Sequence, residues 1–171
     1  MDENEIREVF QKDVFGKESF VGIFRSNHLP SKIMSNHIYV VHTNSPSDHW
    51  NLLSTMESQY DWVDPLGRQP PPEIQQIAKR DKKVLRYSDI MIQSISSTLC
   101  GAYVCLIGLG LCRGISLAEM YMSWFSWQPD HYKYNDALVN LSLAKLTHRK
   151  LQPFVDQDFL LSQLKKETEI D

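Results

Sequence analysis

The chain has 171 residues, of which 42% are hydrophobic and 23% charged, and its formal net charge is −3 at pH 7. This length and this ordinary globular composition predict a single domain over residues 1–171. The slightly negative net charge gives no electrostatic reason for the whole molecule to bind nucleic acid or anionic membranes. The longest apolar run, Leu99 to Cys112, is too short to cross a bilayer.

The first part of the chain carries the signals of one helix followed by strands. A helix is expected over residues 2–14, ended by Gly16, because apolar residues recur there at helical spacing. Its buried face is expected to contain Ile6, Val9, Phe10 and Val14. Residues 20–24 are short, aromatic and β-branched. Strands are predicted over 38–43, 49–53 and 60–64, interrupted by the turn cluster 44–48 and by Pro70–Pro72.

The second part of the chain changes from short strands to helices. An exposed helix is expected over 73–83, and short strands over 84–87 and 90–93. Helices follow at about 99–112, 115–125 (with Ile115, Ala118, Tyr121, Met122 and Phe125 as its face) and 131–149, and a last amphipathic segment covers 153–166. A central antiparallel sheet with helices at both ends of the sequence is typical of an α+β fold.

All three cysteines, Cys100, Cys105 and Cys112, lie in the single apolar run. On one helix these spacings separate the Cα atoms by roughly 7 Å or more, so no disulfide is expected. No CxxC pair exists, and a structural zinc site has little support. The chain also begins without the basic segment and apolar core of a signal peptide. We therefore expect a soluble protein in a reducing, cytosolic or nuclear setting that is not secreted.

Cys100 is a candidate nucleophile because of where it lies. A polar loop, residues 92–98, leads into Cys100 and Gly101 at the start of the predicted helix. The unpaired N–H groups and the dipole at a helix N-terminus stabilise a thiolate and lower its pKa. A cysteine before an apolar helix is, on its own, more often a small core residue. We expect Cys105 and Cys112 to be such core residues.

A cysteine protease requires a base, an orienting acceptor and oxyanion donors beside its thiolate. His49 begins a strand after a turn, and its neighbour Trp50 is expected to wall off its ring. Asp64 ends the next strand and is expected to meet His49 only through loop geometry. Gln93 can offer an amide N–H to an oxyanion, with the backbone N–H of Cys100 as second donor. Each residue alone has a more common structural explanation; their joint order favours a site.

These residues resemble the motifs of the adenovirus protease (adenain) family, which includes homologues from Maverick/Polinton-type transposons and other DNA viruses. The resemblance rests on His49-Trp50, on Trp62-Val63-Asp64-Pro65-Leu66-Gly67, and on Gln93 followed by six residues and Cys100-Gly101. Upstream, Phe20-Val21-Gly22-Ile23-Phe24 with Pro30, and Val41-His42-Thr43, are also similar to family segments. The resemblance covers roughly residues 20–105.

The resemblance implies an α+β fold with a central mixed or antiparallel sheet, a permuted papain-like arrangement shared with SUMO- and ubiquitin-like-protein proteases. It implies that Cys100 is the nucleophile, His49 the general base and acid, and Asp64 the residue that orients the imidazole. Gln93 and the Cys100 N–H would form the oxyanion hole, and Gly101 would let the backbone approach the substrate. The implied activity is that of a monomeric endopeptidase that needs no metal or cofactor. It would cut viral or transposon capsid and core precursors at glycine-containing sites during particle maturation, in the host nucleus or cytoplasm and in the virion.

Three departures from the family pattern affect what is expected. The triad acid is Asp64, where adenain has Glu. Residues 1–99 contain no cysteine, so an activating peptide would bind non-covalently rather than through a disulfide. DNA, a cofactor of the adenovirus enzyme, could bind here only through local basic clusters, although a charge run is more often a solvated face. The clusters are Lys79, Arg80, Lys82, Lys83 and Arg86, and Lys145, His148, Arg149 and Lys150.

Two alternatives remain open. The chain could be an isopeptidase that removes ubiquitin or SUMO-like modifiers from host proteins. That branch usually has an Asp before its cysteine, whereas Leu99 stands here. The chain could also be a catalytically inactive structural or DNA-packaging protein that keeps the fold. The presence of competent residues at all four catalytic positions argues against this alternative.

Overall fold

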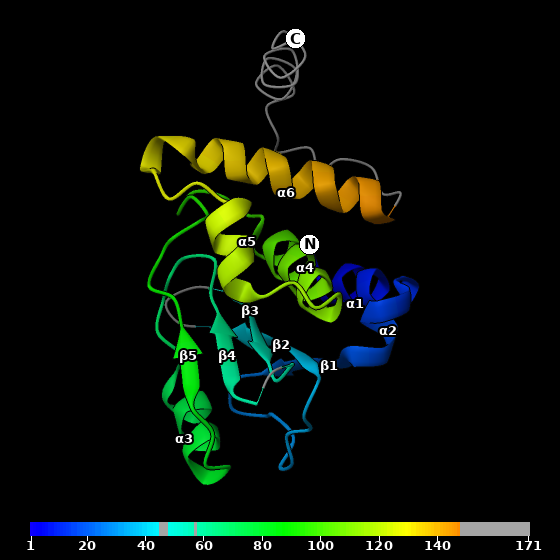
Figure 1. Cartoon of the computed structure of the whole chain (residues 1–171), viewed down its shortest axis with the longest axis vertical. Coiled ribbons are helices and arrows are strands. Elements are labelled where there is room, and N and C mark those ends of the chain that lie inside the picture. The colour runs from blue at the N-terminus through cyan, green and yellow to red at the C-terminus, as the bar shows by residue number, and fades with distance from the viewer. Residues whose placement is uncertain (45–47, 57, 148–171) are drawn as a thin grey trace, which may run out of the picture.

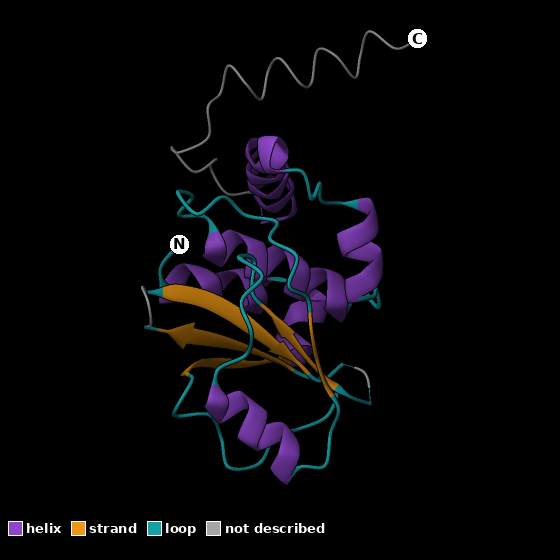
Figure 2. Ribbon diagram, turned by 90° about the vertical axis from the view of Figure 1, so that its left-hand side faces the viewer, coloured by secondary structure: helices purple, strands orange, loops and turns teal. Residues whose placement is uncertain are grey.

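A five-stranded mixed sheet lies between helices on both of its faces (Figure 1, Figure 2). The computed structural model describes residues 1–44, 48–56 and 58–147. The amphipathic segment predicted over 153–166 lies outside the described residues, as do His148, Arg149 and Lys150 of the second basic cluster. The α+β fold predicted from the sequence is confirmed.

The N-terminal segment forms two helices, α1 (Glu3–Lys12) and α2 (Val14–Ser19), where one was predicted. Asp13 between them has an extended backbone, and its carboxylate accepts a hydrogen bond from the N–H of Gly16 at 2.8 Å. This cap starts a new helix. Gly16 therefore lies inside α2 rather than ending the first helix, and Val14, expected on the buried face, is 73% exposed.

The sheet has the strand order β1-β2-β3-β4-β5. Its central strands β2, β3 and β4 are antiparallel as predicted, but both outer pairs, β1 with β2 and β4 with β5, are parallel. The strand expected over 90–93 does not form; the N–H groups of Ile92 and Gln93 both bond to the one carbonyl of Pro65. The strands are β1 (Phe20–Arg25), β2 (Ile38–Thr43), β3 (His49–Ser54), β4 (Tyr60–Val63) and β5 (Leu85–Tyr87).

Helix α3 (Pro72–Arg80) connects the parallel strands β4 and β5 and covers one face of the sheet (Figure 2). It ends three residues before the predicted boundary at residue 83. It was also expected to be exposed, but Ile74 and Ala78 are buried in a small core with Leu53 and Trp62. The crossover therefore closes this side of the sheet.

The opposite face is covered by α1, α2, α4 (Cys100–Cys112) and α5 (Leu117–Ser123), with α6 (Tyr132–Thr147) outermost (Figure 2). Every residue from 101 to 111 in α4 is buried, so this helix is the centre of the main core. The face predicted for residues 115–125 is partly wrong. Met120 is fully buried and Met122 is 71% exposed, because the helix is shorter and turned differently against α4.

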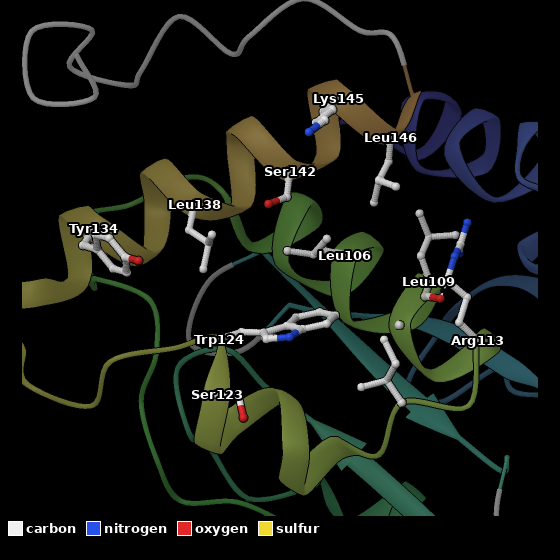
Figure 3. Close-up of a pocket in the computed structure, with 12 residues that line it drawn as sticks. Leu106, Leu109, Arg113, Ser123, Trp124, Tyr134, Leu138, Ser142, Lys145 and Leu146 are labelled. Atoms are coloured by element: carbon white, nitrogen blue, oxygen red, sulfur yellow. Dashed lines mark hydrogen bonds between the residues drawn. The ribbon is translucent and has the colours of Figure 1, made fainter. Parts of the chain in front are cut away.

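An apolar cavity of about 540 Å³ lies between α4, α5 and α6, with Trp124 reaching into it (Figure 3). Its walls include Leu106 and Leu138 but none of the four residues predicted to be catalytic. Within the described part of the chain, no helix is both long enough and apolar enough to cross a membrane.

Candidate active site

Antiparallel pairing of β3 with β4 brings His49 and Asp64 to the same end of the sheet. The register pairs Leu52 with Val63, so the first residue of β3 lies beside the residues that follow β4. His49 Nε2 is 2.7 Å from Asp64 Oδ1, and each residue is only 4% exposed. Asp64 itself lies in the turn just after β4, so the loop geometry that was expected to join the two residues acts together with the pairing of the strands.

The segment Asp64-Pro65-Leu66-Gly67 forms a turn that holds the carboxylate in place. The N–H of Gly67 donates to the carbonyl of Asp64 at 2.9 Å, and the N–H of Leu66 donates to its Oδ1 at 2.8 Å. Gly67 has φ +68°, and a Cβ added there would lie 2.6 Å from the Asp89 carbonyl oxygen. Asp, Pro and Gly thus occupy the turn positions that suit them.

Cys100 is the first residue of α4, and its thiol meets the imidazole of His49. The His49 side chain and the backbone groups of Trp50 and Gly101 lie close enough to the sulfur to lower its pKa. Since Asp64 engages Nε2 of His49, Nδ1 is the ring nitrogen that faces the sulfur. The structure therefore brings Cys100, His49 and Asp64 together in a line, with the imidazole in the middle.

The pKa values of the thiol and the imidazole move toward each other. Burial by itself would raise the pKa of Cys100, but the hydrogen bonds from His49 and Trp50 and the His49 charge hold it below its ordinary value. Burial likewise opposes protonation of His49, yet Asp64 and Cys100 outweigh it and raise the His49 pKa to about 9. At neutral pH these shifts favour a thiolate–imidazolium pair.

Gln93 lies seven residues before Cys100 in the sequence, and hydrogen bonds hold it beside the turn formed by residues 64–67. Its backbone N–H donates to the carbonyl of Pro65 at 3.1 Å, and its Nε2 donates to the carbonyl of Ser97 at 2.8 Å. The side chain is 1% exposed, and its Oε1 has no hydrogen-bond partner among the described residues. Because an amide nitrogen carries two hydrogens, Nε2 retains a second N–H with which to bind an oxyanion.

The sequence did not single out Asn135, a residue of α6 whose side chain holds the loop that contains Gln93. Its Nδ2 donates to the carbonyl of Ile92 at 2.8 Å, next to Gln93, and its side chain is fully buried. The two residues are 43 positions apart, and no local pattern marks Asn135 as part of the site.

Trp50 and Gly101 take part in the packing around the start of α4. The Trp50 ring packs on His42, with 4.6 Å between ring centroids, and its Nε1 donates to the Met1 carbonyl. A Cβ on Gly101 would lie 2.9 Å from the Cβ of Met1 and 3.2 Å from the ring of Trp50. Gly101 therefore permits close packing of α4 against the N-terminus and β3.

The two other cysteines form no disulfide in the described part of the chain and lie outside this cluster. Cys105 is fully buried, as predicted, whereas Cys112 is only partly buried; burial raises the pKa of Cys112. Cys100 combines a basic partner with a lowered pKa, whereas the pKa of Cys112 is raised.

Carboxylates neutralise part of the first basic cluster. Arg80 pairs with Asp81, with 2.7 Å between Nε and Oδ1, and Arg86 pairs with the buried Asp61 at 2.6 Å. Lys83 donates to the Ser58 carbonyl. The cluster at α3 and β5 therefore presents less charge than its sequence suggests.

No group of three or more His, Cys, Asp or Glu side chains suited to a metal ion occurs in the described part of the chain. No protein-family model matches the sequence. A search of curated proteins likewise finds no match. The chemistry that the arrangement can perform therefore rests on the four residues themselves: an activated thiol, a base, a carboxylate and an amide donor.

Proposed function

We propose that this protein is a cysteine endopeptidase with Cys100 as nucleophile. The observation that carries the proposal is His49 between two partners, with Asp64 2.7 Å from Nε2 and the Cys100 thiol on its other side. A buried histidine bonded only to a carboxylate is a common structural feature. A buried histidine that also lowers the pKa of a thiol at a helix N-terminus is the arrangement that acyl transfer requires.

The chemistry follows from these positions. The Cys100 thiolate attacks the carbonyl carbon of the scissile peptide bond, and the resulting oxyanion accepts hydrogen bonds from the Cys100 N–H and the Gln93 amide. The His49 imidazolium then gives its Nδ1 proton to the leaving amine, and the C–N bond breaks to leave a thioester. His49, now neutral, takes a proton from water, which attacks the thioester. The carboxylic acid product leaves and the thiolate–imidazolium pair returns.

The order of the four residues and their neighbours supports membership of the adenain-like group, with its permuted papain-like arrangement. On that basis the substrates are viral or transposon capsid and core precursors, cut at glycine-containing sites. DNA bound near Lys79 and Lys82, and a non-covalent activating peptide, stay predictions of the resemblance.

The test compares the wild-type chain with Cys100→Ala. We expect wild type to cleave short fluorogenic glycine-containing peptides, and Cys100→Ala to be inactive with an unchanged circular dichroism spectrum. Fluorogenic ubiquitin and SUMO C-terminal amides run in parallel. If the protein cleaves the ubiquitin or SUMO substrates but none of the peptides, the isopeptidase function is supported and the endopeptidase function is refuted.

Iodoacetamide labelling at neutral pH tests the alternative that the protein is catalytically inactive. The experiment needs no knowledge of the substrate. Cys100 should react faster than the other two cysteines, because only the thiolate is nucleophilic. Equal rates at Cys100 and Cys112, both of which are partly exposed, would contradict an activated thiol.

A further inference from the structure

The loop that contains Gln93 meets α6 at a second residue besides Asn135. This residue is Asp136, whose carboxylate accepts a hydrogen bond from the Tyr103 hydroxyl of α4 at 2.8 Å. The Ser97 side chain also lies close enough to the carboxylate to lower its pKa. Asp136 therefore contacts both the loop and the helix that follows it.

Ser97 links Asp136 to the side-chain amide of Gln93. The Ser97 carbonyl accepts the hydrogen bond from Gln93 Nε2 at 2.8 Å. The Ser97 hydroxyl oxygen accepts another from the N–H of Leu99, at 3.3 Å. A shift of Ser97 would therefore move the amide nitrogen that the proposed mechanism assigns to the oxyanion.

Tyr103 brings the contact with Asp136 to the other side of Gln93. Its hydroxyl oxygen lies 3.2 Å from the Ile92 carbonyl oxygen as well as 2.8 Å from Oδ1 of Asp136. A hydroxyl has one hydrogen, so the two acceptors share it, and the carboxylate is the stronger of them. Tyr103 is fully buried, so its hydroxyl depends on these protein partners. Asp136 thus fixes the hydroxyl next to the peptide bond that joins Ile92 to Gln93.

Burial raises the pKa of Asp136, so the carboxylate is kept at this place at a cost in free energy. What it contacts there is the loop before the thiol, on both sides of the candidate oxyanion donor. We propose that Asp136 is a positioning residue that holds the Gln93 amide in place for the oxyanion, acting through Ser97 and Tyr103. The role of the amide rests on the proposed endopeptidase function; the hold of Asp136 on the loop does not.

Steady-state kinetics of the full-length chain test this role with glycine-containing fluorogenic peptides. Asp136→Ala should lower kcat about tenfold with little change in KM, because a misplaced donor stabilises the oxyanion less. Asp136→Asn should recover most of this loss, since its amide oxygen can still accept the hydrogen bond from Tyr103. Asp130→Ala, an exposed change just before α6, should match wild type.

Two readouts separate positioning of Gln93 from a general loss of structure. Iodoacetamide should alkylate Cys100 at the wild-type rate in Asp136→Ala, because His49 and Asp64 are unchanged. In a Gln93→Ala background, Asp136→Ala should lower kcat no further, because the donor that it positions is already gone. An equal loss of kcat in both backgrounds would overturn the proposal.

If Asp136→Ala does not fold, Ser97→Ala takes its place. This change removes the hydroxyl near Asp136 and keeps the carbonyl that binds the Gln93 amide. It should lower kcat in the wild-type background and not in the Gln93→Ala background.

Amide hydrogen exchange tests the hold on the loop without catalysis. Asp136→Ala, added to the Cys100→Ala chain, should speed exchange of the Ile92 and Gln93 N–H groups, which both bond to the Pro65 carbonyl. Exchange of residues 104–110 in α4 should stay unchanged.

The outcomes separate the two proposals. Faster exchange in the loop, with no peptide cleavage by wild type, supports the hold of Asp136 on the loop and overturns the endopeptidase. Cleavage by wild type, with unchanged kcat and unchanged exchange in Asp136→Ala, overturns the role of Asp136 alone.

Discussion

Replacing Asp64 by Asn removes the charge behind His49 while nearly preserving the shape of the side chain. The new amide oxygen can still accept the hydrogen bond from the Leu66 N–H, which donates to Oδ1 at 2.8 Å. It can also still accept from Nε2 of His49. What is lost is the carboxylate that stabilises the imidazolium. The change therefore tests electrostatics and leaves the turn in place.

The magnitude follows from the pKa of His49. Burial opposes the charge on this ring, so Asp64 and Cys100 together raise its pKa to about 9 from an ordinary 6.5. That difference corresponds to about 3 kcal/mol in favour of the imidazolium. Loss of Asp64 removes one of the two groups that supply this stabilisation, and the ratio of the thiolate–imidazolium pair to the neutral pair falls about tenfold for each pKa unit that His49 loses.

The assay is the rate of iodoacetamide alkylation of Cys100 as a function of pH. In wild type the rate should reach half its maximum below the ordinary thiol pKa, because His49 lowers the pKa of Cys100. In Asp64→Asn the midpoint should move to higher pH, since a less readily protonated imidazole stabilises the thiolate less. The His49 pKa followed by NMR should fall in the same variant.

Asp61→Asn provides a matched control. Asp61 is on the same chain segment, is 2% exposed and pairs with Arg86 rather than with a histidine. It should lower stability without moving the alkylation midpoint. The same midpoint in wild type and Asp64→Asn would refute the role that we assign to Asp64.

The remaining predictions concern the loops and the core around the site. Gln93→Ala should lower kcat about 10²- to 10³-fold with little change in KM or in Cys100 alkylation, because it removes an oxyanion donor as well as the hydrogen bond to the Ser97 carbonyl; a parallel rise in KM would contradict this. Gly67→Ala should reduce the free energy of unfolding by more than about 1 kcal/mol, measured in urea, and slow turnover, because φ is +68° and the added Cβ meets the Asp89 carbonyl. Cys105→Ala should keep kcat/KM within about threefold at a stability cost of about 1 kcal/mol; a thousandfold loss of kcat in a folded variant would count against Cys100 as nucleophile.

Local patterns predicted most elements well because those elements depend on local chemistry. The buried apolar run over 38–43 forms β2 with the predicted bounds, and the run over 99–112 forms α4 within one residue. Prediction failed where two local signals competed. Asp13 caps a second helix within a segment whose apolar spacing indicated a single one. At 90–93 the residues suit a strand, but no neighbouring strand is available, and the Pro65 carbonyl takes both N–H groups.

The sequence by itself determined which side chains are available for chemistry, and in what order: His49, Asp64, Gln93 and Cys100. Residue type and helix position suffice to single out a thiol, and the DPLG turn can be recognised locally. Tertiary structure alone decided that His49 meets Asp64 and Cys100, because the pairing of β3 with β4 and the turn after β4 bring the carboxylate to the imidazole. It also decided that residues of β3, β4 and the start of α3 line one cavity. Contacts between residues distant in sequence depend on strand pairing and helix packing, which no local pattern encodes.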